Sequence, residues 1–269
     1  MSNSNMPTMR ATFNAFLFIT AFFPIQDTLV SADNMLRKNQ DEHVPVHAAA
    51  PVKVKVLDEA LCSGCKEFVQ KSLAPAYELL GATVIELQVI PFGNARYVAS
   101  EDDPNETVLV CQHGEAECDA NSFEQCVSLY LYPYPQRYLP YIHCLYNELP
   151  MAYSDELIDR SIYASCAKKS ALDWNSIAAC HDDPTRATAL QQIAYALTSK
   201  DHQYVPWVEI EGAHVEMESD DSFLEAVCAA YIKKGGVHPA CAQFSTPRTA
   251  VEPTEKFSIC RAEGEESQL

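Results

Sequence analysis

Two cysteines separated by two residues, Cys62 and Cys65, are the residues whose spacing most directly indicates chemistry. Such a thiol pair can close a disulfide and exchange it with another disulfide through a thiolate. Alternating valines and lysines at 52–56 predict a strand before the pair, and apolar residues at helical spacing predict a helix after it, ending at Gly81. Cys62 therefore falls near a helix N-terminus, where free N–H groups and the helix dipole favour a thiolate. Strand, Cys-x-x-Cys and helix in this order indicate a thioredoxin-like redox site.

Two other interpretations of the pair stay open on spacing alone. A Cys-x-x-Cys motif can be half of a zinc site, but that requires a second close pair, and the next cysteines, Cys111 and Cys118, are separated by six residues. The pair can also be an inert structural disulfide. We expect no metal site and favour redox chemistry.

Composition restricts the class of protein and its compartment. Lys and Arg number 19 against 37 Asp and Glu, a formal charge of −18, which argues against nucleic acid or an anionic membrane as partner. Eleven cysteines are typical of the oxidising secretory pathway rather than of the cytosol. The nine cysteines outside the pair are an odd number, so at least one is expected to be free or to bond another chain.

The chain divides into four expected regions. Residues 1–32 have the basic start, short apolar run and small-residue end of a signal peptide, with a signal anchor as the alternative. Residues 33–51 are interpreted as a linker, 52–241 as the folded domain, and 242–269 as a flexible tail that carries Cys260. No later stretch is apolar enough to span a bilayer, so no membrane contact is expected after signal cleavage.

The pattern inside the domain predicts an α/β fold. A second strand at 83–90 completes a strand–helix–strand unit, and 107–110 forms a third, short strand. Asn105 begins a glycosylation sequon in the loop before that strand, and we expect it to be modified. Helical spacing then dominates an inserted block at about 121–200.

Strand character returns at Tyr204–Glu211, which contains Val205 and Pro206. A proline at a strand start is a candidate cis peptide. In thioredoxin-like folds such a proline faces the redox pair, and the backbone beside it pairs with a substrate strand. Val205 and Pro206 are therefore predicted to bind substrate.

A second cysteine-rich stretch carries a resemblance to a known family. Its residues at set spacing resemble the signature of the gamma-interferon-inducible lysosomal thiol reductase family: Cys111, Gln112, His113, Gly114, Glu117, Cys118, Asn121 and Cys126. Segments 91–95 and 204–208 also resemble family segments, and the resemblance covers roughly 52–241. From the residues alone, His113 could be a ligand or a base, but a structural histidine in a disulfide-stapled loop is favoured.

The resemblance implies a thioredoxin-like sheet with an inserted helical block, stapled by disulfides. It implies a reductase of protein disulfides at acidic pH in endosomes or lysosomes, and secretion remains an alternative. Cys62 is expected to be the nucleophile and Cys65 the resolving thiol, without a bound cofactor and with a small thiol such as cysteine as reductant. A lumenal oxidase or isomerase, or a secreted binding protein without turnover, are the alternative functions.

For the remaining cysteines we hypothesise that neighbours in the sequence bond to each other, although sequence cannot decide connectivity. Cys260 is then left over, for a disulfide-linked homodimer or for removal with the tail. The expected pairs are Cys111–Cys118, Cys126–Cys144, Cys166–Cys180 and Cys228–Cys241.

Overall fold

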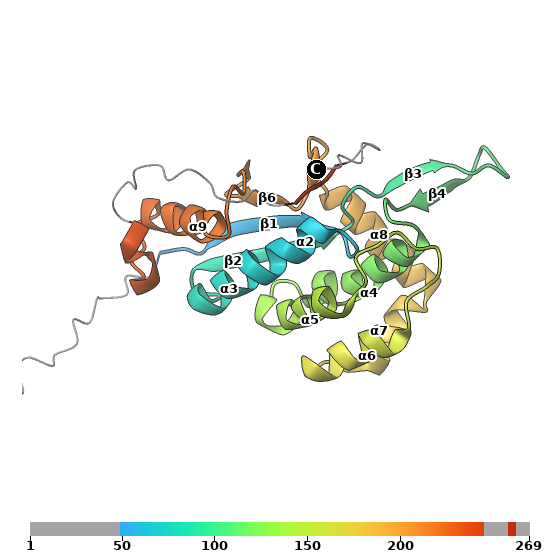
Figure 1. Cartoon of the computed structure of the whole chain (residues 1–269), viewed down its shortest axis with the longest axis horizontal. Coiled ribbons are helices and arrows are strands. Elements are labelled where there is room, and N and C mark those ends of the chain that lie inside the picture. Colours follow the sequence, from blue (N-terminus) through green and yellow to red (C-terminus); the bar gives the residue numbers. More distant parts are fainter. Residues whose placement is uncertain (1–48, 245–257, 262–269) are drawn as a thin grey trace, which may run out of the picture. The chain divides into compact units, whose positions relative to one another are not determined.

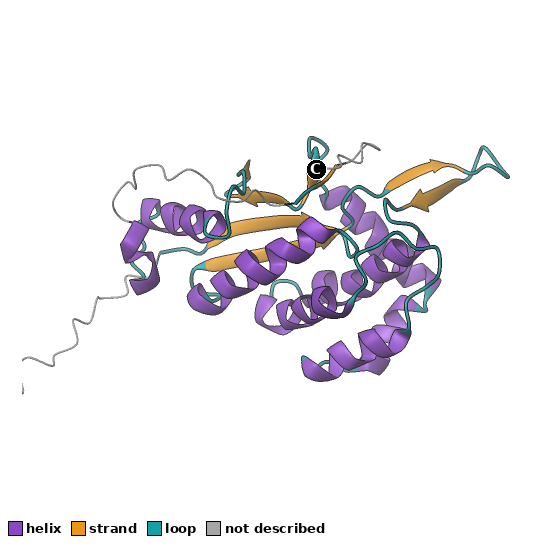
Figure 2. Cartoon of the chain, viewed as in Figure 1, coloured by secondary structure: helices purple, strands orange, loops and turns teal. Residues whose placement is uncertain are grey.

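The central sheet has four strands in the order β2–β1–β6–β7 (Figures 1 and 2). β1 (Val52–Asp58) pairs in parallel with β2 (Ile85–Pro91) and antiparallel with β6 (Trp207–Ile210), and β6 pairs with β7 (Ala213–His214). The valines of β1 are buried and its lysines are not, as the alternation predicts. β1 therefore lies between neighbours on both edges and delivers the residues after Asp58 to a fixed position.

The computed structural model describes residues 49–244 and 258–261. The predicted signal peptide and nearly all of the predicted linker lie outside the described residues. Within the described part of the chain, none of the helices has both the length and the apolar character that crossing a bilayer requires.

The helix predicted after the cysteine pair is present but has an internal π-helical turn. α2 (Ser63–Phe68) passes through η2 (Val69–Leu73) into α3 (Ala74–Leu80), and Gly81 ends it with φ of 67°. The π-helical turn ends just before Pro75, which has no N–H to donate and whose ring would crowd a regular preceding turn. η2 packs against α9 (Ser222–Lys233).

Five helices form the inserted block between β4 and β5. α4 packs along β2, whereas α6 and α7 lie on the side of α4 and α5 away from the sheet (Figures 1 and 2). α4 begins at Glu115, earlier than the predicted boundary near 121, so the second half of the cysteine-rich signature lies on it. The bounds are α4 (Glu115–Leu131), α5 (Pro135–Glu148), α6 (Arg160–Lys169), α7 (Trp174–His181) and α8 (Pro184–Leu197).

One hairpin strand was not predicted. β3 (Arg96–Ala99) pairs antiparallel with β4 (Thr107–Val110), and the hairpin points away from the central sheet (Figure 1). The Asp-Pro-Asn turn between two β-rich runs is the signal that could have identified it. Asn105 is exposed in the connecting loop, where a glycan would not meet the core.

The strand predicted at Tyr204–Glu211 is divided in two by its proline. β5 (Tyr204–Val205) precedes Pro206, the Val205–Pro206 peptide is cis as predicted, and β6 follows. β5 does not join the central sheet; it pairs antiparallel with β8 (Cys260–Arg261), beyond the 3-10 helix η3 (Pro239–Phe244). The interpretation of all of 242–269 as a flexible tail is therefore wrong for Cys260 and Arg261, which pair with a strand of the domain.

Two of the four expected disulfides have different partners. Cys111–Cys118 and Cys228–Cys241 form as expected. The expected Cys126–Cys144 and Cys166–Cys180 pairs are replaced by Cys126–Cys180 and Cys144–Cys166, with Cα atoms 5.9 and 5.5 Å apart. The physical reason is helix packing: α4 faces α7 and α5 faces α6, and a disulfide needs Cα atoms about 4.4–6.8 Å apart whatever the sequence separation.

Candidate redox site

Cys62 occupies the start of α2, as the sequence predicts. It is the N-cap residue of that helix, and its Sγ accepts the backbone N–H of Cys65 at 3.4 Å. Cys62 is bonded to Cys260, 198 residues away, and Cys65 is the free cysteine among the described residues. The expectation that Cys260 is left over is therefore wrong, because β8 brings its sulfur to Cys62. In this form Cys260 is not available to link two chains.

The cis peptide lies beside the same sulfur. The Cys62 Sγ is 3.8 Å from the carbonyl oxygen of Val205, the residue before Pro206. In the β5–β8 pair, Val205 is directly opposite Cys260. The structure thus brings together Cys62, Cys65, Val205 and Pro206, which the sequence had placed in two segments about 140 residues apart.

Buried carboxyl groups surround the pair from the side of the sheet. Asp58 ends β1 and Glu59 follows it, and both are fully buried. Burial raises the pKa of Asp58 to about 7, against a smaller lowering by a hydrogen bond from the Tyr146 hydroxyl at 3.0 Å. Burial, and then the charge of Glu117, raise the pKa of Glu59 well above its usual range. Each carboxyl therefore holds its proton to higher pH than a solvated carboxyl would.

The same surroundings set the protonation of Cys65. Burial raises the pKa of its thiol well above the ordinary value, and the charges of Asp58, Glu59 and Glu117 add to this effect. Ionising Cys65 therefore requires a nearby group that takes its proton. Cys62 is the N-cap residue of α2, and a helix N-terminus favours negative charge.

Glu59 connects the sulfurs to the cysteine-rich signature. A carboxylate oxygen of Glu59 lies within 4.8 Å of the sulfurs of both Cys62 and Cys260. Its Oε1 is 3.6 Å from Nδ1 of His113, and His113 Nδ1 is hydrogen-bonded to Glu117. The His113 side chain is 21% exposed, so a continuous set of ionisable groups runs from the sulfurs to solvent. The direct hydrogen bond between His113 and Glu117 accounts for the short distance between these two side chains.

Other signature residues hold the loops around the site. Asn121 Oδ1 accepts the N–H of Ala60 at 2.9 Å and so holds the turn between β1 and Cys62. Glu117 Oε1 accepts the N–H of Gln112 at 2.9 Å. Gly114 has φ of 87°, and a Cβ there would meet the Ser154 carbonyl oxygen at 2.5 Å, so glycine alone fits.

Sequence reasoning missed Asp58, Glu59, Asn94 and Tyr146. Asp58 and Glu59 interrupt the apolar run Val56–Leu61, and that interruption was the available signal for buried acids. Asn94 lies in the 91–95 segment that carried part of the family resemblance, and its N–H donates to Glu59 Oε2 at 2.8 Å. No local sequence pattern pointed to Tyr146, because its hydrogen-bond partners are 87 and 88 residues away in the chain.

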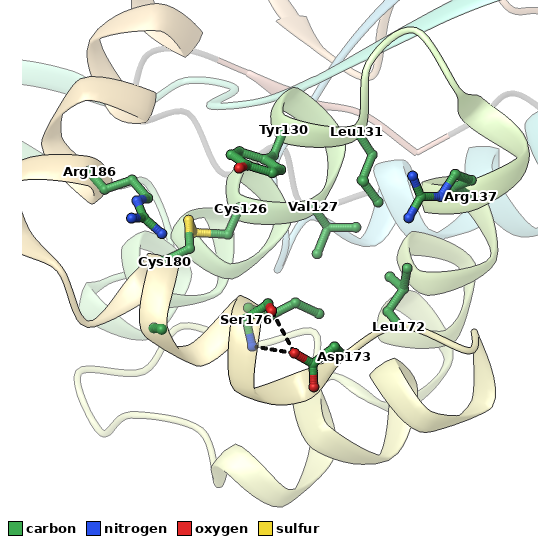
Figure 3. Close-up of a pocket in the computed structure, with 12 residues that line it drawn as sticks. Cys126, Val127, Tyr130, Leu131, Arg137, Leu172, Asp173, Ser176, Cys180 and Arg186 are labelled. Atoms are coloured by element: carbon green, nitrogen blue, oxygen red, sulfur yellow. Dashed lines mark hydrogen bonds between the residues drawn. A yellow bond between two sulfur atoms is a disulfide. The ribbon is translucent and has the colours of Figure 1, made fainter.

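A separate cavity of about 400 Å³ lies in the helical block (Figure 3). The Cys126–Cys180 disulfide forms part of its wall, and Arg137 and Arg186 flank it from different helices. Asp173 in its lining caps α7 by accepting N–H groups of that helix. No residue of this lining is a free thiol, so we do not assign the redox chemistry to it.

A helix-start cysteine beside a cis-proline, on a sheet with a helical insertion, defines a thiol-disulfide oxidoreductase with a thioredoxin-like fold. Two solved structures from Mycobacterium tuberculosis share this fold. Reduced DsbA has a TM-score of 0.51 and 14% identity over 72% of this chain and 87% of its own. The reduced disulfide bond oxidoreductase DsbG has a TM-score of 0.51 and 14% identity over 72% of this chain and 83% of its own.

Sequence comparison identifies the family within that class. The family model described as gamma interferon inducible lysosomal thiol reductase matches residues 53–170. A gamma-interferon-responsive lysosomal thiol protein of Arabidopsis thaliana is 30% identical over 218 residues, 78% of this chain and 84% of the relative. A gamma-interferon-inducible lysosomal thiol reductase of Carassius auratus is 29% identical over 206 residues, 75% of this chain and 76% of the relative. The chain belongs to the gamma-interferon-inducible lysosomal thiol reductase family.

Proposed function

We propose that this protein reduces disulfide bonds of protein substrates at acidic pH in the secretory pathway, either in endosomes and lysosomes or after secretion. Cys62 is the nucleophile and Cys65 the resolving thiol. The observation that carries the proposal is the Cys62–Cys260 bond beside cis-Pro206: a helix-start sulfur joined to a cysteine of an extended strand has the arrangement of a mixed disulfide with substrate. The names of the relatives from Carassius auratus and Arabidopsis thaliana support the lysosomal location.

The reaction balances as a two-electron exchange. The Cys62 thiolate attacks one sulfur of a substrate disulfide, the substrate S–S bond breaks, and the first substrate thiolate leaves and takes a proton. Cys65 then loses its proton, attacks Cys62 Sγ and releases the second substrate thiolate. The substrate has gained two electrons and two protons, and the enzyme holds a Cys62–Cys65 disulfide. Two molecules of a small thiol such as cysteine return it to the dithiol; no bound cofactor is needed.

Glu59 is placed to protonate the thiolate that leaves the mixed disulfide. Its carboxyl group lies within 4.8 Å of Cys62 Sγ and of the position that Cys260 sulfur occupies, which is where a substrate sulfur would leave. Its raised pKa keeps it protonated in acid, so it can donate a proton to the substrate thiolate that leaves from this position. His113 and Glu117 give Glu59 a route for proton exchange with solvent.

Disulfide reduction at acidic pH requires that the Cys62 thiol has a low pKa. A thiol with a pKa of about 8.5 is only about 0.03% ionised at pH 5. The free N–H groups at the start of α2 stabilise a Cys62 thiolate, and the Cys65 N–H already points at its sulfur. The buried carboxyls stay neutral in acid and add little negative charge there, so acid is the condition in which they oppose the Cys62 thiolate least.

The test is reduction of a denatured, disulfide-bonded protein at pH 4.5 and pH 7. The wild type is expected to be active at both, Cys62→Ser inactive, and Cys65→Ser arrested as a covalent mixed disulfide with substrate, detectable by mass. Cys260→Ser is the matched control, since it removes a cysteine from the same cluster but keeps the proposed dithiol. Full activity of Cys62→Ser would show that another thiol, or no thiol of this site, performs the reaction.

A further inference from the structure

The segment Ser258–Arg261 lies in the redox site as an extended peptide. Cys260 is opposite Val205 and Arg261 opposite Tyr204 in the antiparallel β5–β8 pair. The Cys62–Cys260 disulfide anchors this strand at its centre. The chain therefore displays, within one molecule, how a cysteine-containing polypeptide fits the site.

Two carboxamide side chains contact the backbone of that strand. Asn94 Nδ2 donates to the Cys260 carbonyl oxygen at 3.0 Å, and Gln112 Nε2 donates to the Arg261 carbonyl oxygen at 2.8 Å. Asn94 Nδ2 also donates to Gln112 Oε1 at 2.6 Å, so the two amides hold each other in place. Both carbonyl groups belong to the attacked cysteine and its neighbour, which are the positions that any cystine-containing peptide must present.

These contacts do not depend on the side chains of the bound strand. The pairing with β5 and the bonds from Asn94 and Gln112 all use backbone atoms. Backbone carbonyls are common to every polypeptide, and a carboxamide donor keeps its hydrogen atoms at acidic and neutral pH alike. The arrangement is therefore suited to extended segments of many sequences, as unfolded proteins provide.

Gly64 allows the strand to lie close against α2. A Cβ at Gly64 would fall 2.0 Å from the Ser258 carbonyl oxygen and 3.2 Å from the Ile259 Cα. The backbone two residues before Cys260 thus rests directly on the helix start. Glycine within the Cys-x-x-Cys pair provides the space for a peptide backbone at this point.

We propose that Asn94 and Gln112 form a substrate-binding clamp that holds the backbone carbonyl groups of an extended, cystine-containing polypeptide, and that the tail strand occupies the same clamp until it is displaced. The proposal rests on the proposed function, because it assigns residues to substrate binding for that reaction. Displacement of the tail strand begins with a balanced two-electron exchange. Two small thiols reduce the Cys62–Cys260 bond, are themselves oxidised to their disulfide, and leave both cysteines as thiols. A substrate strand then takes the place of β8.

The first measurement needs no turnover. The full-length chain is equilibrated with reduced and oxidised glutathione, and the fraction of Cys62–Cys260 bond is determined by alkylation and mass mapping. Losing one clamp hydrogen bond is expected to shift the equilibrium about fivefold toward the open thiols. Gln112→Ala and Asn94→Ala are the test variants, and Gln192→Ala, on exposed surface of α8, is the matched control.

The second measurement compares two substrates of the same variants. One is a cystine-bridged peptide and the other is hydroxyethyl disulfide, which has no peptide backbone. We expect kcat/KM for the peptide, relative to that for hydroxyethyl disulfide, to fall about fivefold in Gln112→Ala and to be unchanged in Gln192→Ala. Because the Gln112 side chain is only partly buried, this variant tests the clamp even where Asn94→Ala does not fold.

The outcomes separate the clamp from the proposed function. A shift in the glutathione equilibrium without a change in substrate ratio would overturn the clamp as a substrate site and leave it as a contact of the tail alone. No shift in either measurement would overturn it altogether. Loss of the reductase assignment would be seen differently, as Cys62→Ser retaining wild-type turnover with both substrates.

Discussion

Replacing Asp58 with Asn should reduce the dependence of this protein's stability on pH. Asp58 is fully buried, and burial raises the pKa of its carboxyl to about 7. A carboxyl that binds its proton more tightly when folded stabilises the fold in acid, and this stabilisation is lost as pH rises from about 4, the unfolded pKa, to about 7. Asn resembles the protonated acid in shape, and its carbonyl oxygen can still accept the Tyr146 hydroxyl.

The magnitude follows from the two pKa values. For a folded pKa of about 7 and an unfolded value of 3.8, the Asp58 contribution to the free energy of unfolding falls by about 3 kcal/mol between pH 5 and pH 8. Glu59 and Glu124, whose pKa values burial also raises, act in the same direction in both proteins. The wild type should therefore be more stable at pH 5 than at pH 8, and D58N should show a smaller loss.

The assay is urea unfolding at pH 5 and pH 8 with the disulfides intact, followed by fluorescence of the buried Trp207. Asp201→Asn, at an exposed position, is the control for a change of one surface charge and should keep the wild-type pH dependence. If D58N lost as much stability as the wild type between the two pH values, Asp58 would not be the buried proton-binding group described above. A wild type more stable at pH 8 would contradict the sign of the effect.

Two further outcomes follow from particular contacts. Glu59→Gln should slow reduction of an alkyl disulfide by about 100-fold or more, the order expected when proton transfer is lost. It should slow reduction of an aromatic disulfide much less, because an aromatic thiol is acidic and leaves without being protonated. Glu124→Gln, which changes an equally buried carboxyl, is the control, and equal losses on both substrates would contradict proton transfer by Glu59. Replacing both Cys126 and Cys180 with Ala should lower the free energy of unfolding by about 4 kcal/mol, because their bond closes a loop of 54 residues. A loss below 1 kcal/mol in urea unfolding would show that helix packing alone holds α4 to α7.

Local patterns determined the parts of the site that depend on neighbours in the chain. Alternation at 52–56 placed β1, helical spacing after Cys65 placed the following helix, and Gly81 marked its end. Pro206 at a strand start indicated the cis peptide. These features follow from backbone conformation and side-chain periodicity within a few residues, which is the information that a single sequence carries.

Tertiary structure alone decided which distant groups meet. Cys62 bonds Cys260 across 198 residues, because β8 pairs with β5 beside the helix start. Cys126 bonds Cys180 rather than Cys144, because packing of α4 on α7 sets the distance between their Cα atoms. The sequence shows that thiols and acids are present, but bond formation and pKa depend on separations of a few ångströms and on exclusion of water, and both exist only after the chain has folded.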